Sequence, residues 1–253
     1  MSNAQSSSKG ILLENLTWIE AEQALTPDTV IVIPLGAAAK EHGLHLPLKN
    51  DLVLAEYLKR RVLEVAAVVV APTISYSFYP AFLEYPGSIS LSLETARDSL
   101  IDICRSLSRY GPRRFYVLNT GISTIQALRL AAEALATECS LLHYTDFRIV
   151  LGPIESRIAH QEGGTHADEI ETSIMLAIAP EVVDMSKAVK DYHSGRGGLT
   201  RNPQGQGVYS PSGVYGDPTL ATREKGDHLV EALIAGILQD IEALRRSELP
   251  QRL

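Results

Sequence analysis

Short apolar runs alternate along the chain with longer segments in which apolar residues recur every three or four positions. The short runs are rich in β-branched or aromatic residues, which is typical of buried strands. They cover residues 29–36, 66–71, 115–118 and 147–151. The longer segments have the period of amphipathic helices. They start at Asp51 and cover 94–110, 121–139, 166–177 and 224–245.

This alternation predicts right-handed βαβ units and a mostly parallel sheet covered by helices on both faces. The second half differs, because residues 192–217 are dense in Gly, Pro, Ser and Asn. A loop of that length is usually functional, so a lid over a site or an arm for oligomerisation is expected. No linker composition follows it. We therefore predict one α/β domain over residues 10–253.

Composition and charge narrow the class of protein. The chain has 253 residues, of which 45% are hydrophobic, and a formal net charge of -7. Without a basic stripe, neither nucleic acid nor an anionic membrane is expected as a partner, and the substrate should be a small molecule. No run of eighteen apolar residues predicts a transmembrane helix.

The first nine residues are polar and rich in serine, so they are predicted to be a disordered leader. Residues 2–4 are typical of an expression scar or of the end of a trimmed signal peptide. The expected location is therefore the cytoplasm or, if a signal peptide was removed, the periplasm.

Four candidate site residues follow the first long strand. Glu41, His42, His45 and Asp51 lie within eleven residues of one another, directly after the run 29–36. Open α/β sheets bind ligands at the carboxyl ends of their strands. Histidines beside carboxylates are ligands of borderline metals such as zinc. Asp51 also has a structural interpretation as a helix N-cap.

A second group lies in residues 163–173. On a helix, His166 and Glu169 share a face at i and i+3, so both can point at one metal ion or water molecule. Glu171 lies about 140° away and is expected to orient a histidine. The alternative is a capping sequence, with Thr165 as N-cap and acidic residues in the first turn.

Together these groups resemble the creatininase (creatinine amidohydrolase) family. That family carries Gly-Ser-x-Glu-x-His-Gly-x-His-Leu-Pro-x-x-x-Asp, and this chain has His42-Gly-Leu-His-Leu-Pro47 followed by Asp51. The family's His-Ala-Gly-Glu-x-Glu-Thr-Ser is matched at 166–173. Residues 85–90 are similar to the family's Phe-Pro-Gly-Thr, and residues 212–218 are a further match to the family.

The resemblance implies a three-layer αβα fold with a mostly parallel central sheet, and metal-dependent hydrolysis of a non-peptide C–N bond. The substrate class is a small cyclic or formylated amide, and creatinine itself is not implied. The resemblance also implies a homo-oligomer, often a hexamer. The expected cofactor is a divalent metal, zinc first, with manganese and iron as alternatives.

Two departures from the family pattern concern the metal. Lys40 stands where the family has a metal-binding glutamate, and Glu41 could replace it if the loop bulges. The family's Asn-Gly-His is here Asn119-Thr-Gly121, so that histidine is missing. One metal ion is therefore expected rather than two, with ligands drawn from four residues: Glu41, His42, Asp51 and Glu169.

The remaining roles follow from the resemblance and from ordinary side-chain chemistry. His166 is expected to be the general acid for the leaving nitrogen, because histidine titrates near neutral pH, with Glu171 orienting it. Four residues are candidates for substrate contact: His45, Tyr79, Tyr85 and Arg196. Two alternatives stay open, a non-catalytic binding or assembly protein with a degraded metal site, and a hydrolase that uses no metal.

Overall fold

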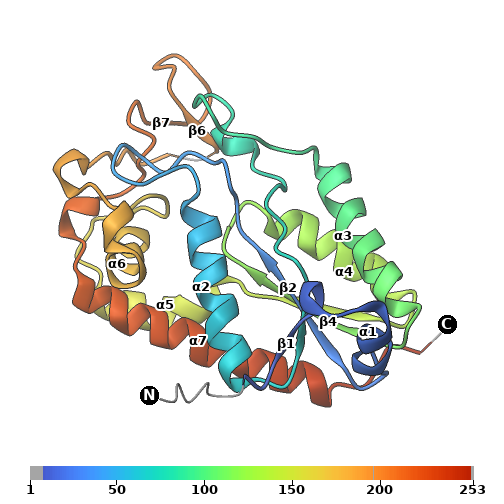
Figure 1. Ribbon diagram of the computed structural model, residues 1–253. Helices are drawn as coiled ribbons and strands as arrows, with labels where there is room; N and C mark the ends of the chain where they lie inside the picture. The colour runs from blue at the N-terminus through green and yellow to red at the C-terminus, as the bar shows by residue number, and fades with distance from the viewer. Residues whose placement is uncertain (1–7, 196, 252–253) are drawn as a thin grey trace, which may run out of the picture.

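The computed structural model describes residues 8–195 and 197–251 and contains a central sheet between two layers of helices (Figure 1). The sheet has five strands in the order β1-β3-β2-β4-β5, and every pair is parallel. The strands are β1 (Ile11–Leu12), β2 (Val30–Leu35), β3 (Val69–Val70), β4 (Arg114–Asn119) and β5 (Leu141–Tyr144). The predicted parallel sheet is confirmed.

Alternate side chains of β2 enter two separate cores, one on each face of the sheet. Val30 and Val32 belong to the first core, and Ile31 and Ile33 to the second. The first face is covered by α2 (Asn50–Val65), α5 (Phe147–Ile158), α6 (Glu169–Ile178) and α7 (Arg223–Arg246). The second is covered by α1 (Trp18–Ala24), α3 (Leu93–Ser108) and α4 (Ile125–Ala136). The three-layer α/β/α architecture follows from this double burial.

Short elements complete the chain. Five 3₁₀ turns are described: η1 (Leu13–Asn15), η2 (Pro80–Phe82), η3 (Pro180–Val182), η4 (Met185–Lys187) and η5 (Pro218–Leu220). The glycine-rich segment 192–217 contains a small parallel pair, β6 (Leu199–Thr200) and β7 (Val208–Tyr209). This pair projects at the top of Figure 1 above η2.

One predicted strand is wrong, because residues 147–151 form the start of α5. Asp146 caps this helix, since its carboxylate accepts a hydrogen bond from the Arg148 amide. The strand lies earlier, at β5, where only Leu142 is buried. An edge strand with one buried residue has no continuous apolar run, and this explains why the pattern missed it.

The helix predicted from residue 166 begins at Glu169. Asp168 is its N-cap and accepts hydrogen bonds from the amides of Ile170 and Glu171. His166 lies before the helix and pairs with Tyr215 in an antiparallel bridge. Thr165 is therefore not the cap, and helical spacing does not relate His166 to Glu169.

The pairing of β2 with β4 positions the site. Leu35 and Asn119 are register partners, so the loops that leave the two strands start side by side at the carboxyl edge of the sheet. Strand β2 connects to β3 on one side and to β4 on the other. This is a position where doubly wound sheets open a crevice for ligands.

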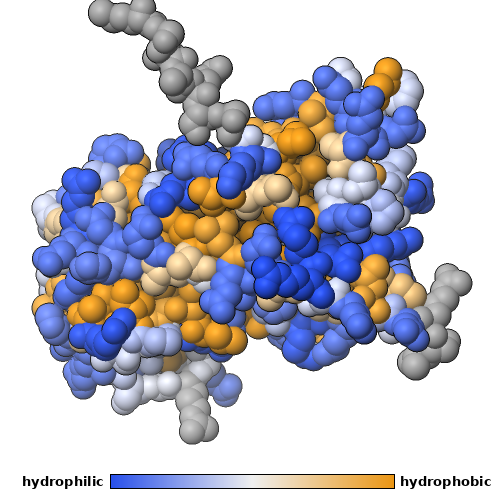
Figure 2. All heavy atoms as spheres, turned by 90° about the horizontal axis from the view of Figure 1, so that it is seen from below, coloured by the Kyte–Doolittle hydropathy of each residue, from blue (hydrophilic) through white to orange (hydrophobic). Residues whose placement is uncertain are grey.

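β1 and α1, which lie in the lower part of Figure 1, carry exposed apolar side chains. Trp18 is 76% exposed, and Ile19 and Ile11 are also exposed. Seen from below, apolar areas lie between hydrophilic ones (Figure 2). Within the described residues, no helix is long and apolar enough to cross a membrane.

Close packing of α6 against α7 makes a first prediction about stability. A Cβ at Gly226 would overlap the Ser173 carbonyl, so Gly226→Ala should destabilise the fold by about 1–3 kcal/mol. In α5, a Cβ at Gly152 meets nothing, so Gly152→Ala should be neutral or stabilising by up to about 1 kcal/mol. Urea unfolding measures both; equal effects would contradict this packing.

Candidate active site

The loop after β2 turns its polar side chains inward. Lys40, Glu41, His42 and His45 are all buried. The His42 ring lies with Nδ1 2.8 Å from the Lys40 carbonyl and Nε2 2.7 Å from Asp51 Oδ1. With the Nδ1 hydrogen donated to the carbonyl, Nε2 faces a carboxylate oxygen. A proton or a metal ion must lie between those two atoms, because both carry lone pairs.

Asp51 is buried in the first turn of α2 between two basic groups. Its Oδ2 lies 2.7 Å from Lys40 Nζ, and its Oδ1 contacts His42. Burial alone would raise the pKa of Asp51, but the Lys40 ammonium and the His42 ring hold this pKa well below its usual value. Its side chain caps no helix amide, so the N-cap alternative is wrong.

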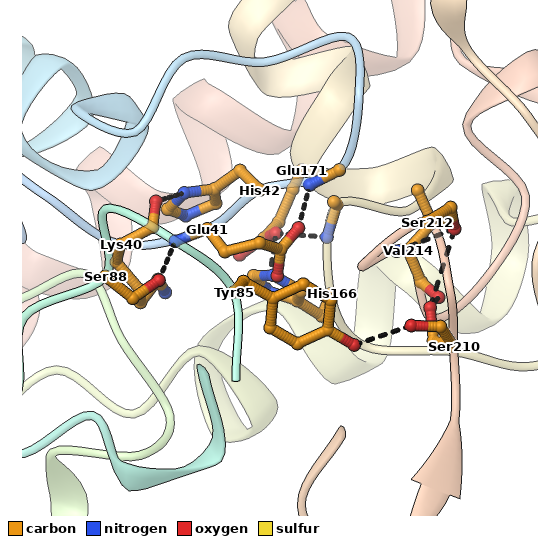
Figure 3. A network of polar contacts seen from close by, with 12 residues as sticks. Lys40, Glu41, His42, Tyr85, Ser88, His166, Glu171, Ser210, Ser212 and Val214 are labelled. Carbon is orange, nitrogen blue, oxygen red and sulfur yellow. Dashed lines mark hydrogen bonds and ion pairs between the residues drawn. The ribbon is translucent and has the colours of Figure 1, made fainter. Parts of the chain in front are cut away.

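His166 lies beside the His42 ring, with ring centroids 5.1 Å apart. Its Nε2 is 3.0 Å from Glu41 Oε2, and its Nδ1 is 3.6 Å from Glu171 Oε2 (Figure 3). Burial favours the neutral ring, but the two carboxylates outweigh it and raise the pKa of His166. Both nitrogens of His166 thus face negative charge.

Glu41 is held against His166 by its surroundings. Its amide donates to Ser88 Oγ at 2.9 Å, and its carboxylate contacts the Gly43 amide. At Gly213 the backbone has φ +82°, and a Cβ there would overlap this carboxylate. The serine of the Tyr85-Pro-Gly-Ser88 motif and the glycine after Ser212 are therefore both explained by the placement of Glu41.

Glu171 reaches back from α6 to the segment before the helix. Its Oε2 accepts a hydrogen bond from the Ala167 amide at 2.6 Å. Ala167 has φ +48°, an uncommon conformation for a residue with a side chain. One ligand atom from each of His42, His166 and Glu171 lies within 4.8 Å of the others. Two nitrogens and one oxygen at this separation suit a single divalent ion.

Glu169 does not join this cluster, which corrects the expectation that it is a metal ligand. Its carboxylate is fully buried and accepts from the amides of His160 and Gln161 at 2.8 and 2.7 Å. It also contacts Lys225 Nζ of α7. The expectation assumed that a helix starts at His166. Since α6 starts three residues later, Glu171 and not Glu169 lies beside the histidines.

His45 connects the loop to α6. Its Nε2 lies 2.8 Å from Thr172 Oγ1, and its Nδ1 has no hydrogen-bond partner in the described part of the chain. Burial lowers the pKa of His45 to about 4, so this ring is neutral at physiological pH. His45 does not line the cavity described below, so substrate contact is not what its position supports.

The tyrosines expected to contact substrate are also packed away from that cavity. Tyr85 donates its hydroxyl hydrogen to the Ser210 carbonyl at 2.7 Å, and burial raises its pKa to about 12. Tyr79 is 1% exposed, and burial raises its pKa further. Arg196, the fourth expected contact, lies outside the described residues.

A cavity of about 290 Å³ opens beside the cluster. Lys40, His166 and Glu171 line it, and Phe82 packs its ring 4.4 Å from that of His166. Further walls come from the segment 197–199 before and in β6, from α5 and from the loop after β4. Neither Phe82 nor the start of α5 was predicted at the site. No sequence pattern distinguishes an apolar side chain that lines a cavity from one that packs in the core.

The loop after β4 supplies no ligand. Asn119 donates to the carbonyls of Gly121 and Thr145, and its Oδ1 accepts from Thr124. Thr120 donates to the Leu35 carbonyl. These hydrogen bonds connect the end of β4 to the neighbouring loops, at the position where the resemblance implies a histidine in the family.

Residues 14–241 match the sequence model of the creatininase family, which is described as creatinine amidohydrolase. The chain is 28% identical to a creatinine amidohydrolase of Pseudomonas putida, with 96% of this chain and 99% of that protein covered. It is 27% identical to a mycofactocin precursor peptide peptidase of Mycolicibacterium smegmatis, with 84% of each covered.

Solved structures show the same fold. A creatinine amidohydrolase (creatininase) structure has a TM-score of 0.78 and 25% identity, and the match covers 95% of this chain and all of that one. A mutant creatininase in a form titled Zn-Zn has a TM-score of 0.77 and 25% identity, with 95% of this chain and all of that one covered. The predicted creatininase-like αβα fold is thereby confirmed.

The two glutamates of α6 should separate in a mutational test. Glu171→Gln should weaken zinc binding by at least about tenfold, because it removes a charged donor from the cluster. Glu169→Gln should leave zinc binding unchanged and lower the free energy of unfolding by about 1.5–3 kcal/mol, because Lys225 and two amides lose a charged acceptor. Competition with a chromogenic chelator and urea unfolding measure these effects. The reverse pattern would restore Glu169 as the ligand.

Proposed function

Because the chain belongs to the creatininase family, we propose that it hydrolyses a C–N bond of a small amide at a centre that holds one divalent metal ion. The observation that carries the proposal is the joint placement of His166 and Glu171 on the wall of the cavity, beside His42. Acidic and basic groups that share a cavity wall are the parts needed for proton transfer to and from a substrate.

The donor set fits one ion. His42, His166 and Glu171 come together at one point; His42 and Glu171 would hold the ion, and His166 beside them would stay free of the ion and serve as the general acid. A bound divalent ion would supply positive charge that lowers the pKa of a water molecule and polarises an amide carbonyl. A second ion does not fit at Asp51, since the Lys40 ammonium already neutralises that carboxylate. Zinc is the first candidate, and manganese and iron are alternatives.

The residues of the chain account for the proton transfers. Water adds to the amide carbon and gives one proton to the carboxylate of Glu171. The C–N bond then breaks, its electron pair goes to nitrogen, and that nitrogen takes a proton from His166. Glu41 and Glu171 favour the protonated form of His166 and so keep it able to donate. The carboxylic acid and amine that result account for all atoms of the amide and the water.

The cavity supports the substrate class. Most of its exposed wall is apolar, polar side chains such as Lys40, His166 and Glu171 also line it, and its volume suits a compact molecule. A small cyclic or formylated amide meets these conditions, with its apolar part between the side chains of Phe82, Leu151 and Ile170.

A second candidate is a non-catalytic binding protein of the same fold. The ion pair of Lys40 with Asp51 and the structural use of Asn119 favour it, because both replace potential metal contacts by internal ones. The two candidates differ in whether metal binds and whether amides are hydrolysed.

Removal of the metal tests the proposal. Purified protein loaded with zinc should hydrolyse at least one member of a panel of creatinine, hydantoin, N-formylglycine and N-formylalanine, and EDTA should abolish this. His42→Ala should lower zinc affinity by at least about 100-fold. His143→Ala, at an exposed position of β5, is the matched control and should change neither zinc binding nor activity. Absence of zinc binding and of amide hydrolysis would favour the non-catalytic candidate.

The proposal includes self-association, as the family resemblance implies. Exposed Trp18 and Ile19 on α1 are candidates for the subunit interface. Light scattering coupled to size exclusion should show a multiple of the chain mass, with the hexamer as one expected form. A monomer at concentrations of tens of micromolar would contradict this part.

A further inference from the structure

Lys40 is a buried cation that the proposed reaction has not yet used. Its side chain is 4% exposed and forms an ion pair with Asp51, which is 2% exposed. The ammonium lies 4.8 Å from the centroid of the Phe82 ring and 5.8 Å from that of Tyr79. Aromatic faces attract a cation at such distances. The charge is thus held at one position by a carboxylate and two rings.

The Lys40 ammonium has N–H donors that its ion pair with Asp51 does not use. It carries three N–H groups, and among residues 8–195 and 197–251 Asp51 is its one carboxylate partner. Aromatic rings accept no strong hydrogen bond. Lys40 also lines the cavity, together with His166 and Glu171. The remaining donors are therefore available to a molecule in that cavity.

Stability alone does not account for this arrangement. Removing two charges from water costs several kcal/mol per ion, and apolar residues of similar volume often replace a buried ion pair without loss of stability. Here the costly pair lies at the wall of the cavity, next to the groups that can move protons. This position points to a role in binding or in chemistry.

We infer that the Lys40 ammonium takes the place of a second metal ion at Asp51 and binds the carbonyl oxygen of the substrate. The binding of the carbonyl oxygen rests on the proposed function. The replacement of the second metal ion rests only on the ion pair of Lys40 with Asp51. Lys40 is then a catalytic residue, since it touches the reacting carbonyl group.

The chemical contribution is electrostatic. When water adds to the amide carbon, the π electron pair of the carbonyl moves onto oxygen, and the negative charge develops beside the ammonium. No proton leaves Lys40 in this step. When the carbonyl reforms, the electron pair of the C–N bond goes to nitrogen, which takes its proton from His166. A fixed cation in a buried site stabilises such charge more strongly than water does.

Zinc stoichiometry tests the replacement of the ion, whatever the substrate is. After zinc loading and gel filtration, elemental analysis should find one equivalent in the natural sequence and two in Lys40→Glu, where the new carboxylate joins Asp51. Lys59→Glu is the matched control, because Lys59 is also largely buried and paired with a carboxylate, Glu56, at 2.6 Å. It should keep one equivalent. Two equivalents in the natural sequence, or one in a folded Lys40→Glu, would overturn the replacement.

Lys40→Gln covers the case in which Lys40→Glu does not fold, since it removes the charge and keeps a polar side chain that is one atom shorter. It should bind one zinc equivalent and lose about 10²–10³-fold in kcat on the hydrolysed amide. KM should change less than tenfold, and Lys40→Arg should recover part of kcat. Unchanged kcat in a folded Lys40→Gln would overturn the carbonyl contact. If the natural sequence hydrolyses no amide of the panel, the proposed function fails, whereas zinc stoichiometry still decides the replacement of the ion.

Discussion

The negative charge of Asp51, buried at the carboxyl edge of the sheet, is the constraint around which the site is built. A carboxylate with almost no contact to water requires positive charge or hydrogen bonds close by, and the loop after β2 supplies the Lys40 ammonium at one carboxylate oxygen and the His42 ring at the other. Meeting this requirement fixes the course of the loop. Glu41, between Lys40 and His42 in the sequence, points toward His166. The contact of Glu41 with His166 joins the two halves of the site.

The second half depends on where α6 begins. Asp168 caps the helix, so α6 begins at Glu169. In this position Glu171 accepts a hydrogen bond from the Ala167 amide, whereas Glu169 forms an ion pair with Lys225 of α7. Two acidic residues two positions apart thus have different tasks. Glu171 contributes to the cluster beside the cavity, and Glu169 joins α6 to the last helix, α7.

Much of the architecture was predictable because its signals are local. β2 is buried on both faces and therefore reads as one apolar run, and α7 keeps its apolar period over its whole length. β5 and α5 were predicted wrongly for two reasons. An edge strand carries a weak pattern, and the apolar run Ile149-Val150-Leu151 at the start of α5 has the composition of a strand although Ile149 is 74% exposed. For the site, His42, His166 and Glu171 were all recognised as site residues, whereas the metal contact expected of Glu169 is not what the structure places there.

The sequence by itself determined the family, the α/β class and the chemical types at the site, because motifs and periodicity depend on neighbouring residues. Only the tertiary structure decided which of these side chains meet. The contact of Glu41 with His166, and the separation of Glu169 from these two residues, depend on how a loop and a helix from distant parts of the chain pack at one edge of the sheet. Contacts of that kind are set by burial and charge balance over the whole site, and no local pattern encodes them.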